Sequence, residues 1–158
     1  MTSGVLIDLP VPDHRVDHLE AAEGLPATAK KLKQLFLEHH GLLISSPEYN
    51  SSISGALKNT IDWVSRAESD DEPTLAAYIG KTAVLCSASP GHLGGLRGLV
   101  HVRAILGNVG VTVLPNQVAV SRADQAFRPD GTLVDEELAT RVRNLGTQLT
   151  NHLRKMLA

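Results

Sequence analysis

Three short, continuous apolar runs separated by helical patterns most constrain the fold of this 158-residue chain. The runs cover residues 42–45, 82–86 and 111–114, and each is too short to be a helix. An apolar run without alternation is typical of a parallel strand that is covered on both faces. Parallel strands are joined by crossovers, which place helices on both faces of the sheet. We therefore predict an α/β fold with an open parallel sheet, in a single domain over residues 1–158.

Helical periodicity separates these runs. Apolar residues recur at three- and four-residue steps from Thr28 to His39, and Gly41 is well placed to end that helix. The same spacing predicts helices over residues 54–66 and from the end of a glycine-rich loop to about Gly107. The last helix has the clearest pattern, with acidic residues at its start, basic residues at its end and an apolar stripe formed by Leu138, Val142, Leu145, Leu149 and Leu153.

The remaining segments are predicted as short strands, turns and loops. A first strand covers Val5 to Leu9, and a proline-rich, acidic loop follows it to Gly24. Pro115 is expected to stop the strand at 111–114, and residues 118–120 are a candidate for a further short strand. The other predictions are a turn at Asp130-Gly131 and an acidic, solvated loop over residues 67–74.

The overall charge excludes some partners. The formal net charge is -2 and the pI is about 6.4, so no global positive field favours nucleic acid or an anionic membrane. No apolar run is long enough to span a membrane, and the start of the chain does not resemble a signal peptide, so we predict a cytoplasmic protein. The single cysteine, Cys86, lies in an apolar run and is predicted to be a buried structural thiol.

Two loops that follow predicted strands carry the candidate ligand-binding residues. In an open parallel sheet, ligands bind at the carboxyl ends of the strands. The first loop, residues 46–53, contains Glu48, Tyr49 and Asn50, whose ring, side-chain amide and backbone amides could hold a flat, hydrogen-bonding heterocycle. From its chemistry alone, the same tetrapeptide is equally consistent with an ordinary capped turn.

The second loop, residues 87–97, is rich in small residues that allow a ligand to approach the backbone closely. It matches neither the phosphate-binding Walker motif nor the spaced three-glycine dinucleotide motif. A turn followed by a helix cap is the alternative interpretation of this loop. The histidines, among them His14, His18 and the pair at 39–40, lack a third ligand at metal-site spacing, so we predict no metal site.

Both loops resemble motifs of the NADPH-dependent FMN reductases, a family with a flavodoxin-like fold that includes quinone, azo-dye and chromate reductases. The first motif is Pro47-Glu48-Tyr49-Asn50 followed by Ser54-Gly55-x-Leu57-Lys58-Asn59-x-Ile61-Asp62-Trp63. The second runs from Ser87-Ala88-Ser89-Pro90-Gly91 to Gly94-Gly95-Leu96-Arg97. The resemblance covers nearly the whole chain from Val5.

The resemblance implies an oxidoreductase that passes a hydride from NADPH or NADH to bound FMN and then electrons to a small acceptor such as a flavin or quinone. It implies no catalytic side chain, and it implies a homodimer or homotetramer formed through helix 54–66, which carries Lys58, Asn59 and Trp63. The residues that it places at the flavin are Pro47, Glu48, Tyr49 and Asn50 along the ring and ribityl region, and Ser87, Ser89 and Gly91 by the pyrimidine edge. His92, where a glycine is commoner in the family, is a further candidate to face the ligand.

The sequence departs from the family at its amino-terminal end. Val5 to Leu9 matches the family's second strand, so we expect the first strand, the Gly-Ser-x-Arg-type phosphate loop and the first helix to be absent. Losing about three hydrogen bonds to a charged phosphate would cost roughly 4 to 9 kcal/mol of FMN binding. Two alternatives follow: a non-catalytic relative that acts as an oligomerising or ligand-binding module, or an incomplete version of an ordinary reductase. Val5 to Leu9 could pair directly with residues 42–45, or another chain could fill that place in the sheet.

Overall fold

A computed structural model describes residues 24–158, which fall into two compact units. The described part of unit 1 comprises residues 24–39 and 55–78, and unit 2 comprises residues 40–54 and 79–158. The predicted strand Val5 to Leu9, most of the proline-rich loop, His14 and His18 lie outside the described residues.

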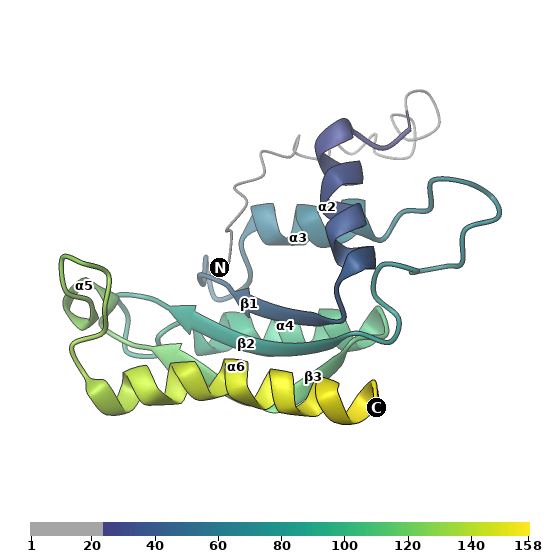
Figure 1. Cartoon of the computed structure of the whole chain (residues 1–158). Coiled ribbons are helices and arrows are strands. Elements are labelled where there is room, and N and C mark those ends of the chain that lie inside the picture. The colour runs from purple at the N-terminus through teal and green to yellow at the C-terminus, as the bar shows by residue number, and fades with distance from the viewer. Residues whose placement is uncertain (1–23) are drawn as a thin grey trace. The chain divides into compact units, whose positions relative to one another are not determined.

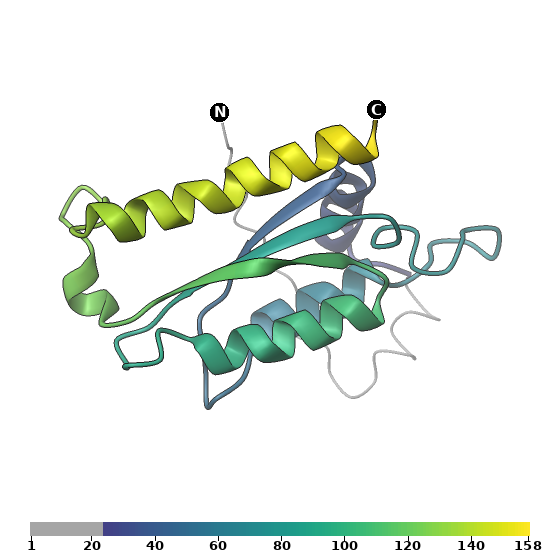
Figure 2. The ribbon, with the colours of Figure 1, turned by 90° about the horizontal axis from the view of Figure 1, so that it is seen from below.

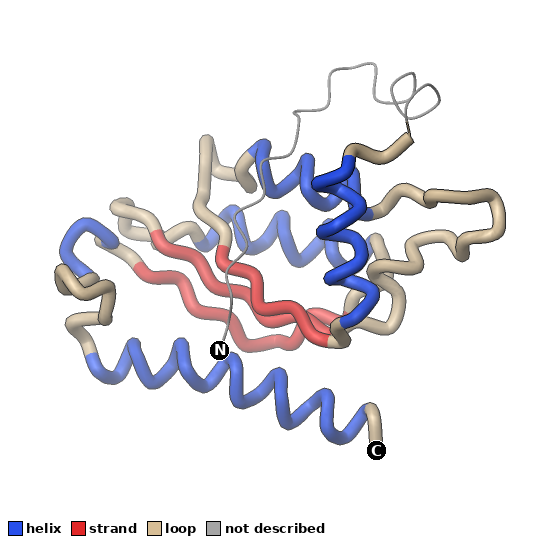
Figure 3. The backbone as a smooth tube through the Cα atoms, turned by 45° about the horizontal axis from the view of Figure 1, so that its top comes forward, coloured by secondary structure: helices blue, strands red, loops and turns tan. Residues whose placement is uncertain are grey.

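Unit 2 contains the predicted open parallel sheet. Its strands are β1 (Gly41–Ser45), β2 (Thr82–Ala88) and β3 (Thr112–Val120), and they are paired in that order. Both pairings are parallel, and Figure 3 shows the three strands side by side. The central strand β2 is buried along most of its length. The prediction of a parallel α/β sheet is confirmed.

Helices cover both faces of this sheet. Helix α6 (Glu136–Met156) packs on all three strands, and α4 (Leu96–Asn108) packs on β2 and β3. Figure 2 shows α6 and α4 on opposite sides of the strands. The Asp135 side chain caps α6, accepting hydrogen bonds from the amides of Glu137 and Leu138 at 2.9 and 3.1 Å. The buried core on the α6 side comprises Val84, Val118, Val120, Leu145 and Leu149, with half-buried Cys86 packed against it.

Strand β1 differs from its prediction, because the described elements of unit 2 cover it on one face, that of α6. Leu43 is 56% exposed, and among residues 24–158 the strand pairs only with β2. Gly41 is the first residue of β1 rather than the end of the preceding helix. A Cβ at this position would lie 2.5 Å from a Leu153 methyl group, so the glycine allows α6 to approach the strand closely.

Strand β3 also differs, because Pro115 does not end it. A bulge accommodates the proline: Val84 alone lies between the paired residues Ala83 and Leu85 of β2, whereas three residues of β3 lie between their partners. One terminal nitrogen of the Arg103 guanidinium, on α4, donates to the backbone carbonyls of Val113 and Leu114 at 3.2 and 3.0 Å. The other donates to the Pro115 carbonyl and to the side-chain amide oxygen of Gln117. Arg103 thus supplies donors to backbone carbonyls at the bulge, where regular pairing with β2 is interrupted. The segments predicted as two strands, 111–114 and 118–120, therefore form the single strand β3.

The loop between β2 and α4 packs closely on the end of β3 and the residues that follow it. Gly94 has a φ of +59°, and a Cβ there would lie 2.6 to 2.9 Å from backbone atoms of residues 119–121. The Ser89 amide donates to the Val120 carbonyl, and the Ala123 amide donates to the Ser89 carbonyl. A short helix, α5 (Ala123–Ala126), follows this contact (Figure 1).

Unit 1 contains α2 (Ala27–Glu38), α3 (Gly55–Val64) and the segment that follows α3. Leu25, Ala29 and Trp63 form its apolar cluster. The Tyr78 ring packs edge-on against Phe36, with centroids 5.4 Å apart, and its hydroxyl donates to the Ile61 carbonyl. Both predicted helices are present, with ends shifted by one or two residues.

The acidic loop after α3 was predicted to be only a solvated surface, but it binds a buried lysine. Lys33 is 1% exposed, lies 2.5 Å from the Glu72 carboxylate and donates to the Arg66 carbonyl at 2.6 Å. Burial opposes ionisation of Glu72, but hydrogen bonds from Lys33 and from the Glu68 amide hold the pKa of Glu72 below its ordinary value of 4.5. This cluster joins α2 to the acidic loop.

No helix within residues 24–158 is long and apolar enough to cross a membrane.

Replacing Lys33 with methionine should lower the free energy of unfolding by about 2 kcal/mol at neutral pH, because Glu72 loses its cation and the Arg66 carbonyl loses this donor. Urea unfolding followed by the fluorescence of Trp63, the single tryptophan, measures the change. Since the folded state lowers the pKa of Glu72, its stabilisation is present above the unfolded value and is lost as the pH falls through the folded value. The difference between the variant and the wild type should therefore shrink at acidic pH.

The matched control is Lys58→Met, which removes an exposed ion pair with Asp62 within α3. This substitution should cost no more than about 0.5 kcal/mol, because exposed helix pairs contribute little. Equal losses in the two variants would contradict a buried lysine cluster.

Replacing Gly94 with alanine should destabilise unit 2 by roughly 2 to 4 kcal/mol, because the new methyl group meets backbone atoms as well as requiring a positive φ. Thermal unfolding followed by circular dichroism measures the loss. Gly131→Ala separates the two causes, because Gly131 also has a positive φ, +82°, but has open space around it. The control should lose only about 1 kcal/mol, and a similar loss in both variants would contradict the close packing at Gly94.

Candidate functional site

The candidate site lies at the edge of unit 2 where β1 and β2 end. Because the strands are parallel, residues 46–54 after β1 and residues 89–95 after β2 leave the sheet at the same edge. The Ser46 amide donates to the Cys86 carbonyl at 3.0 Å, which extends the pairing to the start of the first loop. Figure 1 shows the arrowheads of β2 and β3 pointing in the same direction.

A tight turn forms the tip of the first loop. Tyr49 and Ser52 exchange two backbone hydrogen bonds, each of 3.0 Å, and the two residues between them, Asn50 and Ser51, have φ angles of 50° and 66°. Two central residues with positive φ are the signature of a type I′ turn. The turn leaves the Tyr49 side chain 62% exposed and Asn50 exposed beside it. A ring and a side-chain amide are therefore presented together at the surface.

The Glu48 carboxylate ties this loop to the first turn of α4. One oxygen accepts hydrogen bonds from the Arg97 Nε at 2.9 Å and from its Nη2, and the other accepts from the backbone amides of Arg97 and Gly98 at 3.0 and 3.3 Å. The Arg97 side-chain hydrogen bond is the main reason why the pKa of Glu48 is lowered, with the Gly98 amide and the Arg97 charge acting in the same direction against desolvation.

A second side-chain contact joins the loop to α4. The Ser52 hydroxyl lies 2.8 Å from Nδ1 of His101. Arg97 and His101 are four residues apart, so both project from one side of the helix. Ser52, at the end of the tight turn, and Glu48, just before the turn, are thus both bonded to α4.

In the second loop, two serines are used inside the protein. Ser87 is buried, and its hydroxyl donates to the Gly94 carbonyl at 2.7 Å. The Ser89 hydroxyl accepts a hydrogen bond from the Gly91 amide at 3.3 Å. Gly91 and His92 are exposed. Among residues 24–158, only the Ser89 hydroxyl lies within 4 Å of the position that a Cβ of Gly91 would occupy.

The structure brings the two predicted loops together. A Cβ at Gly95 or Gly98 would lie about 3.6 or 3.5 Å from the Glu48 Cβ, so the start of α4 lies against the first loop. All of the predicted site residues belong to unit 2, namely Pro47, Glu48, Tyr49, Asn50, Ser87, Ser89, Gly91 and His92. Sequence reasoning did not include Arg97, Ser52 or His101 in the site, although the four-residue spacing of Arg97 and His101 was visible.

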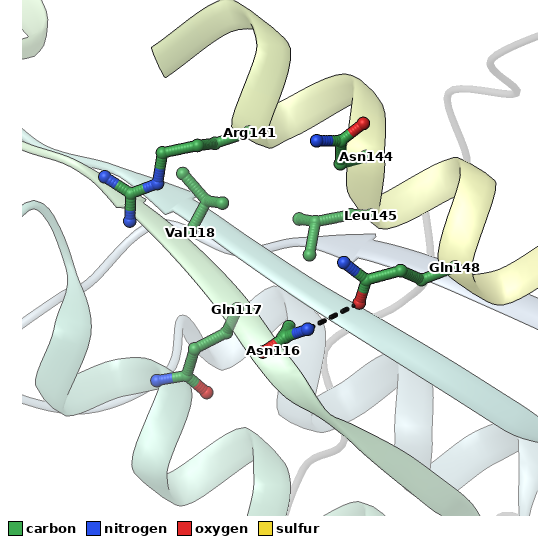
Figure 4. Close-up of a pocket in the computed structure, with 7 residues that line it drawn as sticks. All are labelled: Asn116, Gln117, Val118, Arg141, Asn144, Leu145 and Gln148. Atoms are coloured by element: carbon green, nitrogen blue, oxygen red, sulfur yellow. Dashed lines mark hydrogen bonds between the residues drawn. The ribbon is translucent and has the colours of Figure 1, made fainter. Parts of the chain in front are cut away.

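Two hollows lie elsewhere in unit 2. One, of about 190 Å³, is lined mainly by amide side chains of β3 and α6 (Figure 4), where Asn116 donates to Gln148 at 2.7 Å. The other, of about 440 Å³, lies between the start of α6 and residues 127–133. None of the predicted site residues lines either hollow. Within the part of the chain that the structure describes, no group of three or more His, Cys, Asp or Glu side chains could hold a metal ion.

Comparison with known proteins identifies relatives of this chain. The sequence pattern of the NADPH-dependent FMN reductase family matches residues 5–125. The chain is 35% identical over 117 residues to an NAD(P)H-dependent FMN reductase of Pseudomonas aeruginosa, a match that covers 73% of this chain and 60% of the relative. It is 39% identical over 101 residues to a quinone reductase of Escherichia coli, covering 64% of this chain and 49% of the relative. The chain thus spans about half to three fifths of the length of these relatives.

A solved structure agrees with these matches. The flavoenzyme NAD(P)H:(acceptor) oxidoreductase FerB of Paracoccus denitrificans superposes with a TM-score of 0.72 at 27% sequence identity, covering 92% of this chain and 77% of that protein. The predicted flavodoxin-like fold is confirmed by this likeness together with the order of the parallel strands. The family match covers more than half of the chain and includes both candidate loops. This chain belongs to the NADPH-dependent FMN reductase family.

Proposed function

We propose that this protein is a flavin-dependent NAD(P)H oxidoreductase that binds FMN at the edge formed by the two loops of unit 2 and reduces a small acceptor such as a quinone or a free flavin. The observation that carries the proposal is the tight turn after β1, which presents Tyr49 and Asn50 beside the glycine-rich loop. Family membership supports the same reaction class.

The residues present fit a planar, hydrogen-bonding ring. Tyr49 offers an exposed aromatic ring, and Asn50 offers both a donor and an acceptor. Gly91 leaves space where a larger side chain would stand. Ser87 would act through its backbone, because its hydroxyl already donates to Gly94. Such an arrangement can hold one face and one edge of a flavin.

When bound, FMN would supply the redox chemistry by accepting a hydride from NAD(P)H and passing two electrons to the acceptor, which takes its protons from solvent. The role of this chain's residues is to bind and orient. Pro47 and Tyr49 would bound the ring, Asn50 would fix its edge, and the exposed His92 would face the open side where a nicotinamide or an acceptor approaches. No side chain is required to act as an acid or a base.

Flavin titration tests the proposal. Adding the protein to FMN should quench flavin fluorescence to saturation, and NADPH oxidation at 340 nm should then depend on both FMN and a quinone. Because the candidate contacts are all on the ring side, riboflavin should bind within about tenfold of FMN. Asn50→Ala and Tyr49→Ala should each weaken binding by about tenfold, since each removes one ring-side contact. The matched control is Asn151→Ala, which changes an exposed residue of α6 and should leave binding unchanged.

If the protein neither quenches flavin fluorescence nor oxidises NADPH, the proposal of an oxidoreductase is refuted. That result would favour the second candidate, a non-catalytic relative that acts as an oligomerising or ligand-binding module. Robust flavin-supported quinone reduction would exclude the second candidate.

We further propose a cytoplasmic homodimer or homotetramer that forms through helix α3. The intracellular supply of NAD(P)H supports the location. Within unit 1, Asn59 and Trp63 are buried, so a subunit contact on this helix would use exposed residues such as Ala56 and Lys58.

Sedimentation should therefore show a dimer or tetramer, and Ala56→Arg should shift it to a smaller species, because a large charge replaces a methyl group in the contact. Asn151→Arg, an exposed substitution on α6, should leave the mass unchanged. A wild-type monomer at micromolar concentration would contradict the proposal.

A further inference from the structure

The acceptor capacity of the Glu48 carboxylate is already used inside the protein. A carboxylate offers about four lone-pair positions on its two oxygens. Four donors reach Glu48: the Arg97 amide, the Gly98 amide, and Nε and Nη2 of Arg97. The side chain is only 8% exposed. A ligand would therefore have to displace one of these bonds to contact the carboxylate.

Two of these donors make the Glu48 carboxylate a cap of helix α4. They are the second and third amides of α4, in its first turn, where amides have no partner within the helix and carry the positive end of its dipole. The residue at the N-cap position of α4 is Gly95, which has no side chain to accept hydrogen bonds from these amides. Glu48 thus caps a helix that lies 49 residues further along the chain.

Gly98, in the first turn of α4, allows this close approach. A Cβ at Gly98 would lie 3.2 Å from the Ser52 carbonyl oxygen and 3.5 Å from the Glu48 Cβ. The loop backbone therefore lies directly against the first turn of the helix. Glu48 immediately precedes Tyr49, the residue that begins the tight turn, so a shift of the carboxylate moves the turn.

We propose that Glu48 is a positioning residue: its carboxylate, bound to Arg97 and to the end of α4, fixes the orientation of the Tyr49–Ser52 turn, and it does not itself contact the ligand. The inference rests on the proposed function in one respect, since the ligand at the turn is taken to be a flavin. It changes the role that the sequence assigned to Glu48, and it adds Arg97 to the residues on which the site depends.

The test compares Glu48→Gln, Arg97→Gln and the double variant. Each single variant should weaken both FMN and riboflavin binding by about tenfold, because both ligands share the ring. The double variant should be no weaker than the weaker single variant, since both changes remove one contact. Fluorescence titration gives the dissociation constants, and visible circular dichroism of the bound flavin reports its orientation.

Glu136→Gln is the matched control, because it makes the same chemical change at an exposed carboxylate of unit 2. It should change neither the affinity nor the spectrum. Thermal unfolding of every variant separates loss of folding from loss of positioning.

Three results would overturn the inference. A direct contact would make Glu48→Gln weaken binding while Arg97→Gln did not. Additive losses in the double variant would mean that the residues act separately. Lower melting temperatures with unchanged flavin affinity and spectrum would mean that the contact is only structural.

Amide hydrogen exchange of the ligand-free protein distinguishes failure of this inference from failure of the proposed function. In Glu48→Gln, the amides of Tyr49 and Ser52 should exchange at least about tenfold faster than in the wild type. If the wild type binds no flavin, the proposed function fails, and the exchange rates alone decide whether Glu48 positions the turn. Unchanged exchange would overturn the inference.

Discussion

The parallel pairing of β2 with both of its neighbours is the constraint on which the rest of unit 2 depends. Parallel strands start at one edge of a sheet and end at the other, so the loops after β1 and β2 must leave together. The same pairing requires a crossover between β2 and β3, and this crossover contains α4, which packs on one face of the sheet. Helix α6, which follows the last strand, covers the other face (Figure 2). The site is therefore a consequence of the sheet: two loops meet there because two strands end there.

Sequence periodicity predicted the elements whose pattern is local. The continuous apolar runs gave β1 and β2, and the stripe from Leu138 to Leu153 gave α6 with nearly its observed ends. Two of the errors share one physical cause, which is a contact between residues that are not neighbours in sequence. Pro115 remains inside β3 because Arg103 donates to the carbonyls around the bulge. Lys33 likewise reaches the acidic loop, which a local interpretation assigns to solvent.

At the candidate site, the local motifs likewise identified the residues but did not show the contacts that those residues make. The two motifs identified which loops matter, because the residues of each motif are neighbours in sequence. They did not show what Glu48 does, since its partner Arg97 is 49 residues away. Nor did they show that the Ser87 hydroxyl is spent on Gly94 within its own loop. A motif fixes residue types at a surface, whereas only the folded chain shows which of their polar atoms remain available.

The backbone of the turn shows why several contacts converge on it. Asn50 and Ser51 both adopt positive φ, a conformation that costs on the order of 1 kcal/mol for a residue other than glycine. Such a turn persists only when its surroundings hold it, and here two backbone bonds close it while Glu48 and Ser52 attach it to α4. A loop that is already ordered loses little conformational entropy when a ligand binds. The contacts with α4 therefore maintain the strained turn in the folded protein. As a result, the ring-side residues are ordered when the protein folds rather than when a ligand binds.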